Sequence, residues 1–166
     1  VELDIPGLPQ PLCCCSVHMP ARSAVEQLSQ AQYLGALVAQ KPYVLLGGDF
    51  NSYPRSGPTV PIDQLQSLPP HLRVTRCHTS IDGQLELNFD VDDTFLRAGL
   101  VDIAAHLSQT LHDPSLLKPT GKGGARGDRL YGSPALAAVA TDYRQINTGS
   151  DHDGLIFVLD LARCSQ

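Results

Sequence analysis

The sequence predicts an α+β fold in which one β-sheet packs on another and helices lie outside. The apolar segments typical of strands are mostly short, a few helices lie between them, and there is no regular strand–helix–strand repeat. The 166 residues suffice for a hydrophobic core, since a chain of this length buries roughly 70% of its unfolded surface. With 42% hydrophobic and 17% charged residues, the composition is that of a globular protein and excludes wholesale disorder.

The first third of the chain contains the clearest predicted elements. Leu12 to Val17 is a continuous apolar run that Pro20 closes, which indicates a buried strand. A Ser-x-x-Glu capping box at residue 23 and apolar residues at helical spacing predict an amphipathic helix over residues 23–40. A Lys-Pro pair then ends the helix, and Tyr43 to Leu46 forms a short predicted strand.

The middle of the chain is predicted to be rich in loops. Residues 53–70 contain five prolines and are expected to be mostly loop, with one helical turn near residues 62–68. A weak strand is predicted over residues 72–78, followed by a polar hairpin around Asp82 and Gly83. The proline and glycine content therefore predicts sharp turns between these segments.

The last part of the chain returns to regular elements. Asp92 to Ala98 forms a predicted short helix that Gly99 closes in the left-handed conformation. A Gly- and Lys-containing loop follows at residues 118–125. Three further strands are predicted, over Arg126–Ser133, Leu136–Tyr143 and Leu155–Leu161.

Charge and cysteine content restrict the possible partners and compartments. Seventeen acidic residues outnumber twelve basic ones, and a net charge of −5 disfavours a nucleic-acid binder without excluding a local basic rim. No stretch approaches the roughly 20 apolar residues of a membrane span. The odd count of five cysteines, three of them adjacent at residues 13–15, favours small buried thiols in a reduced, cytoplasmic protein. Because Val1 is no initiator Met, we expect the chain to begin inside a longer protein, and its targeting is unknown.

Polar residues are concentrated at the ends of predicted strands. His18 follows the cysteine-rich strand, and three further clusters are Asp49-Phe50-Asn51, Arg126-Gly127-Asp128-Arg129 and Ser150-Asp151-His152. Strand ends bring distant parts of a sequence together, so sites are often built there. Carboxylates bind Mg²⁺, an amide donates to phosphate oxygens, and a histidine moves a proton near neutral pH. These side chains predict hydrolysis of a phosphate ester with a hard divalent cation.

In these segments the chain resembles the metal-dependent endonuclease/exonuclease/phosphatase superfamily. Its members include deoxyribonucleases of the pancreatic type, apurinic endonucleases, sphingomyelinases and inositol polyphosphate phosphatases. The resemblance implies a deoxyribonuclease-like β-sandwich of two similar sheets with outer helices. The matching segments are Ser16-Val17-His18-Met19-Pro20 with the helix after it, Gly48-Asp49-Phe50-Asn51, Ala98-Gly99-Leu100-Val101-Asp102, Arg126 to Ser133, and Ser150-Asp151-His152-Asp153.

The resemblance implies a role for each matching residue. Asp49 and Asn51 match the pair that orients the nucleophilic water and contacts the scissile phosphate. His152 matches the base or phosphate-contacting histidine, and Asp128 matches the carboxylate that pairs with it. Such a pair fixes the imidazole tautomer and raises the imidazole pKa.

Two more residues and the cofactor follow from the same resemblance. Asp151 matches the acid on the metal side of the site, and the implied metal is Mg²⁺ or Mn²⁺. His18 matches a histidine that assists the leaving group in nuclease members. The implied reaction is attack of water on phosphorus, in which the cation and hydrogen-bond donors neutralise developing negative charge.

The chain departs from the family pattern at its start. Family members carry an earlier half with an Asn near the first strand and a Glu that is the principal metal ligand. The only acidic residues before His18 are Glu2 and Asp4, and neither has the strand context of that ligand. We therefore expect residues 1–166 to be a single partial domain that lacks its N-terminal strands. Weak metal affinity, little catalysis and an exposed apolar sheet face are then expected of this chain alone.

Two functional hypotheses remain open. The first is a divalent-metal-dependent phosphoesterase, active as the complete protein, and the alternative is a non-catalytic binding or structural module. The substrate is a phosphoester, either a small molecule or nucleic acid, and no specific protein partner is implied. The loop at 118–125 is expected to bring Lys122 and Arg126 near an anionic substrate, whereas its glycines do not have the spacing of a Walker loop.

Overall fold

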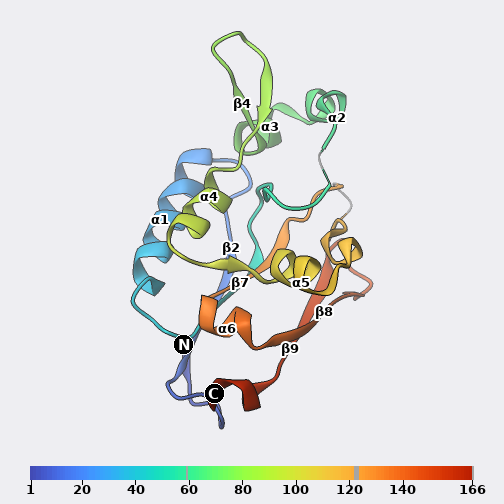
Figure 1. The fold of residues 1–166 in the computed structure, drawn as a ribbon. Coiled ribbons are helices and arrows are strands. Elements are labelled where there is room, and N and C mark those ends of the chain that lie inside the picture. Colours follow the sequence, from blue (N-terminus) through green and yellow to red (C-terminus); the bar gives the residue numbers. More distant parts are fainter. Residues whose placement is uncertain (59, 122–123, 166) are drawn as a thin grey trace.

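The computed structural model describes residues 1–58, 60–121 and 124–165, with mixed helices and strands (Figure 1). Within these residues, a five-stranded sheet has the order β1-β2-β3-β7-β6, and β4-β5 and β8-β9 form separate two-stranded sheets. The strands are β1 (Glu2–Leu3), β2 (Leu12–His18), β3 (Val44–Asp49), β4 (Cys77–Thr79), β5 (Leu85–Leu87), β6 (Val101–Asp102), β7 (Asp128–Gly132), β8 (Ala140–Asn147) and β9 (Asp153–Leu159). The helices are α1 (Ala24–Val38), α2 (Ile62–Ser67), α3 (Pro70–Arg76), α4 (Asp90–Arg97), α5 (Ile103–Leu111) and α6 (Pro134–Ala138), with short 3₁₀ helices at Pro114–Leu117 and Leu161–Ser165.

The register of the central sheet brings three predicted site segments to one end. Strand β2 runs parallel to β3, and His18 lies opposite Asp49. Strand β7 runs antiparallel to β3, so that Asp128, the first residue of β7, also lies opposite Asp49, the last residue of β3. Gly48 permits this close pairing, because a Cβ built there would lie 1.9 Å from the carbonyl oxygen of Val17.

The two faces of the central sheet bury separate cores. Helices α1 and α4 cover one face, where Phe50, Phe95 and Tyr131 pack edge-on or tilted with ring centroids 5.1 to 5.5 Å apart. Helix α5 and the β8–β9 sheet contribute to the core of the other face, which includes Leu130 and Tyr143. Sheet therefore packs against sheet with helices outside, as predicted (Figure 1).

An arm made of α2, α3 and the β4–β5 hairpin stands beyond the carboxyl ends of β2 and β3 (Figure 1). Its own small core includes Tyr53, Leu65 and Cys77. The hairpin turn predicted around Asp82 and Gly83 is confirmed, and Gly83 has a φ of +78°. No helix of the described residues is long and apolar enough to cross a membrane.

Several predicted elements in the first two thirds of the chain are confirmed. The strand from Leu12 and the helix after Ser23 are present, and the hydroxyl oxygen of Ser23 accepts a hydrogen bond from the backbone N–H of Glu26 at 3.3 Å. The helical turn near residues 62–68 is α2. The helix before Gly99 begins at Asp90, two residues earlier than predicted, and Gly99 has the expected positive φ of +84°.

Other predictions about the fold were wrong for local reasons. The strand predicted over residues 72–78 is mostly helix α3, because Pro70 occupies the first turn, where its missing N–H costs nothing. The strand predicted over Leu136–Tyr143 begins as helix α6, which Ser133 caps by accepting from the N–H of Leu136 at 3.4 Å. Helix α5 was not predicted at all.

Candidate active site

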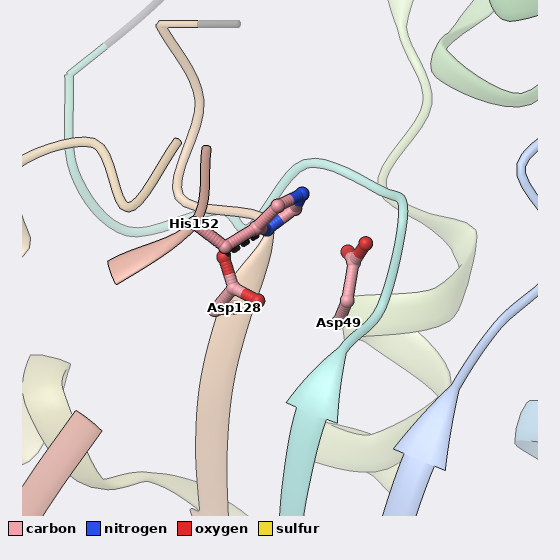
Figure 2. Close-up of side chains that lie close together, drawn as sticks. All are labelled: Asp49, Asp128 and His152. Atoms are coloured by element: carbon pink, nitrogen blue, oxygen red, sulfur yellow. Dashed lines mark hydrogen bonds and ion pairs between the residues drawn. The ribbon is translucent and has the colours of Figure 1, made fainter. Parts of the chain in front are cut away.

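Three predicted residues meet where strands of the central sheet and of the β8–β9 sheet begin or end. Asp49 ends β3, Asp128 begins β7, and His152 lies in the turn just before β9 (Figure 2). One ligand atom from each of these side chains lies within 4.8 Å of the others. The three residues line a pocket of about 150 Å³, whose described lining residues are Asp49, Asn51, Arg76, Gly121, Ala125, Gly127, Asp128, Asp151 and His152.

His152 and Asp128 form a hydrogen-bonded pair. Nδ1 of His152 lies 2.8 Å from Oδ2 of Asp128, and because a carboxylate only accepts, Nδ1 carries the proton. This hydrogen bond raises the pKa of His152, an effect that partial burial opposes and that the charges of Asp128, Asp49 and Asp151 reinforce. Figure 2 shows the other ring nitrogen, Nε2, on the side of the ring away from Asp128. The pair therefore leaves Nε2 as the atom that can meet a substrate or exchange a proton.

Asp49 and Asn51 form a tight turn at the end of β3. The backbone N–H of Asn51 donates to Oδ1 of Asp49 at 2.8 Å, and the φ of Asn51 is +47°, a conformation that Asn tolerates. The side-chain NH₂ of Asn51 donates to the backbone carbonyl of Met19 at 2.9 Å, and the backbone carbonyl of Asn51 accepts from the side-chain NH₂ of Gln27 at 2.9 Å. The turn is thus held from both sides, which fixes the Asp49 carboxylate in the pocket.

The remaining two predicted residues lie around this cluster. His18 is largely exposed, and its Nε2 lies 3.9 Å from Oδ2 of Asp49. Asp151 lines the same pocket, but it does not belong to the group formed by Asp49, Asp128 and His152. The structure therefore places all six predicted residues at one end of the sheet, with three of them in direct proximity.

Arg126 does not face a substrate, contrary to the prediction. Its side chain is 1% exposed, and Nη1 donates to Oδ1 of the buried Asp102 at 3.1 Å. Nη2 also donates to the hydroxyl of Ser56 at 2.6 Å and to the Asp102 carboxylate. Arg126 is the cationic partner that the buried Asp102 carboxylate needs, so its guanidinium is already engaged in this ion pair. Lys122, predicted to act beside it, lies outside the described residues.

Arg76 is a pocket residue that the sequence did not indicate. It ends helix α3, and it is the only Arg or Lys among the described residues that line the pocket. No motif surrounds Arg76. A strand was predicted over residues 72–78, where the structure has the helix that carries this arginine. Only the folding of the arm over the strand ends brings Arg76 to the pocket.

Comparison with known proteins identifies the class of fold. The chain shares its fold with solved nuclease and phosphatase structures, in agreement with the deoxyribonuclease-like β-sandwich that the resemblance implied. No model of a protein family and no curated protein matches the sequence. The fold assignment therefore depends on solved structures.

Three solved structures illustrate this similarity. An AP endonuclease from Archaeoglobus fulgidus superposes with a TM-score of 0.60 at 18% identity, over 89% of this chain and 61% of that chain. The 3′ phosphatase NExo from Neisseria, bound to a product DNA hairpin, gives 0.60 at 17% identity, over 96% of this chain and 72% of that one. The 3′-5′ exonuclease NExo from Neisseria meningitidis gives 0.57 at 18% identity, with the same coverage. The chain thus spans 61 to 72% of the length of these proteins.

Proposed function

We propose that this protein is a phosphoester hydrolase whose pocket contains Asp49, Asp128 and His152 and requires a divalent cation. The observation that carries the proposal is the His152–Asp128 pair beside the Asp49 carboxylate, at the end of a sheet with a nuclease-like fold. A carboxylate-oriented imidazole and a second carboxylate are the groups that phosphoester hydrolysis uses to position water and move a proton.

The charges of the pocket support the need for a cation. Among its described lining residues, Asp49, Asp128 and Asp151 offer three carboxylates, whereas Arg76 and His152 offer the positive charge. A phosphoester brings at least one more negative charge, which such a pocket would repel on its own. Carboxylate oxygens are the ligands that Mg²⁺ and Mn²⁺ prefer, so Asp151 is the proposed metal ligand among the described residues that line the pocket.

The proposed chemistry assigns one task to each side chain. Asp128 holds the proton on Nδ1 of His152, so that Nε2 exchanges a proton or contacts a phosphoryl oxygen. Asp49 and Asn51 orient the water that attacks phosphorus, and His18, whose Nε2 lies 3.9 Å from Oδ2 of Asp49, assists the leaving group. A bound divalent cation supplies electrostatic stabilisation of charge that develops on the phosphoryl oxygens.

We further propose that the complete enzyme contains another carboxylate ligand, a Glu outside these 166 residues. The resemblance implies that ligand, and the metal-type cluster of the described residues contains only Asp49, Asp128 and His152. Nucleic acid is the favoured substrate, because one structural neighbour is a 3′ phosphatase bound to a product DNA hairpin. This chain alone is then expected to bind metal weakly and to turn over little substrate.

The test is hydrolysis by the complete protein of 3′-phosphorylated DNA, abasic DNA, an inositol phosphate and a phospholipid, with Mg²⁺ or with EDTA. We expect Mg²⁺-dependent release from a DNA substrate and none in EDTA. The control is Asp160→Asn, since Asp160 pairs with Arg163 outside the pocket. Binding of a phosphoester without hydrolysis of any member of the panel would contradict the proposal and favour a non-catalytic module.

A further inference from the structure

The arginine that lines the pocket, Arg76, has a fixed position in the arm. The backbone N–H of Asn88 donates to the carbonyl of Arg76 at 2.9 Å, and the Asn88 side chain donates to the carbonyl of Thr75 at 3.2 Å. The hydroxyl of Thr75 in turn donates at 3.1 Å to the carbonyl of Ala21, which lies just after the strand of His18. Hydrogen bonds therefore fix the backbone at Arg76 and Thr75 to Asn88 and to Ala21, which lies in the loop between β2 and α1.

The guanidinium of Arg76 is also held by an aromatic ring. Its Cζ lies 5.7 Å from the centroid of Tyr53, whose side chain is buried. Stacking on an aromatic face restricts the long side chain while leaving its terminal nitrogens able to donate. The side chain therefore loses little further entropy when it binds a ligand.

Four arginines of the described residues are paired with an aspartate, whereas Arg76 is not. Arg55, Arg126, Arg144 and Arg163 each form an ion pair with an aspartate. In the part of the chain that the structure describes, no ion pair joins Arg76 to a carboxylate, although Asp49 and Asp128 line the same pocket. A fixed cation without an acidic partner, in a pocket lined by carboxylates, remains available for an anionic group.

We propose that the guanidinium of Arg76 donates hydrogen bonds to the non-bridging oxygens of the substrate's phosphoryl group. The inference rests on the proposed function and adds a specific binding residue to it. A guanidinium matches two phosphate oxygens at once, which a lysine ammonium does not. Arg76 lies on the arm, so it approaches the phosphoryl group from a different element than the cluster of Asp49, Asp128 and His152.

The test compares Arg76→Gln and Arg76→Lys with Arg73→Gln in the complete protein. Arg73 lies one turn earlier on α3 and lines a different hollow, so it is the matched control. Binding of inorganic phosphate in Mg²⁺ is measured by calorimetry, and KM is measured with bis(p-nitrophenyl) phosphate. For Arg76→Gln we expect the Kd for phosphate and the KM each to rise about 10- to 100-fold, the usual effect of losing hydrogen bonds to a charged group. Arg76→Lys should lie between Gln and wild type, and Arg73→Gln should match wild type.

Each outcome decides the assignment of Arg76. Unchanged phosphate affinity in Arg76→Gln overturns it, as does an equal loss in Arg73→Gln or a wild-type protein that binds no phosphate. If Arg76→Gln fails to fold, Arg76→Lys decides through the same comparison, with wild-type affinity overturning the assignment. Phosphate binding that depends on Arg76, in a protein that hydrolyses none of the substrate panel, supports this assignment and contradicts the proposed hydrolase.

Discussion

The buried ion pair of Arg126 and Asp102 gives a stability prediction that is independent of catalysis. Both side chains are at most 4% exposed, and they are linked through the hydroxyl of Ser56, which donates to Asp102 at 2.9 Å. Replacing Asp102 by Asn keeps the size of the side chain and an oxygen acceptor. The substitution leaves the guanidinium of Arg126 charged and buried without its carboxylate partner, although its hydrogen bond to the Ser56 hydroxyl remains.

The expected cost of Asp102→Asn is about 3–5 kcal/mol in the free energy of unfolding, the usual result of removing one partner of a buried pair. This is a large share of a typical domain stability of about 5–15 kcal/mol. Asp102→Ala should cost about 1 kcal/mol more, because Asp102 also caps α5 by accepting from the N–H of Ala105 at 3.2 Å. For a chain of this length, Asp102→Asn should lower the Tm by roughly 6–20 °C.

The assay is urea denaturation monitored by circular dichroism, with Asp142→Asn as the control. Asp142 pairs with Arg144 on the surface, where a salt bridge contributes at most about 1 kcal/mol. The reasoning is refuted if Asp102→Asn destabilises the protein no more than Asp142→Asn does.

The same pair fixes the pH dependence of stability. Burial alone would raise the pKa of Asp102, but the charge and hydrogen bonds of Arg126 outweigh burial and hold it below its ordinary value. A carboxyl with a lowered folded pKa contributes stability above its unfolded pKa of about 3.9 and loses it as the pH falls through the folded pKa. The gap between wild type and Asp102→Asn should therefore close in strong acid.

Three further predictions concern the pocket and the outer sheet. Asp128→Asn should lower the pKa of His152, measured by NMR titration of the imidazole, because the hydrogen bond that raises it loses its charged acceptor; an unchanged titration would contradict the pairing. Because the folded pKa of His152 is raised, the stability that Asp128→Asn removes should be largest in acid and vanish as the pH rises through that pKa. On the outer face of β9, Ile156 and Val158 are 44% and 45% exposed, so light scattering should show concentration-dependent self-association that Ile156→Lys suppresses; a monomer at all concentrations refutes this.

Local sequence signals predicted the parts of the fold that local physics determines. The apolar run before His18 and the cap at Ser23 were sufficient for β2 and α1. The prolines after residue 53 were read only as loop signals, although Pro70 begins helix α3. The sequence analysis did not predict helix α5. It used Asp102 only as the last residue of the matching segment from Ala98, whereas the Asp102 side chain caps the helix.

The site divides in the same way between local and tertiary information. Asp49, Asp128 and His152 stand at predicted strand ends, and the order and register of the strands bring them together. Arg76 was beyond sequence reasoning, because its position depends on the packing of the arm through Thr75 and Asn88. Burial of Arg126 likewise depends on Asp102, which lies 24 residues away.

The central claim is that Asp49 and His152 belong to a hydrolytic site for phosphoesters. Its most direct test is the rate of Mg²⁺-dependent hydrolysis by the complete protein carrying Asp49→Ala or His152→Ala, with His71→Gln as an exposed histidine control. We expect both alanine variants to lose at least about 100-fold in rate, the lower range for removal of an acid–base group, and His71→Gln to keep the wild-type rate. Full metal-dependent activity in either alanine variant would contradict the assignment of the site.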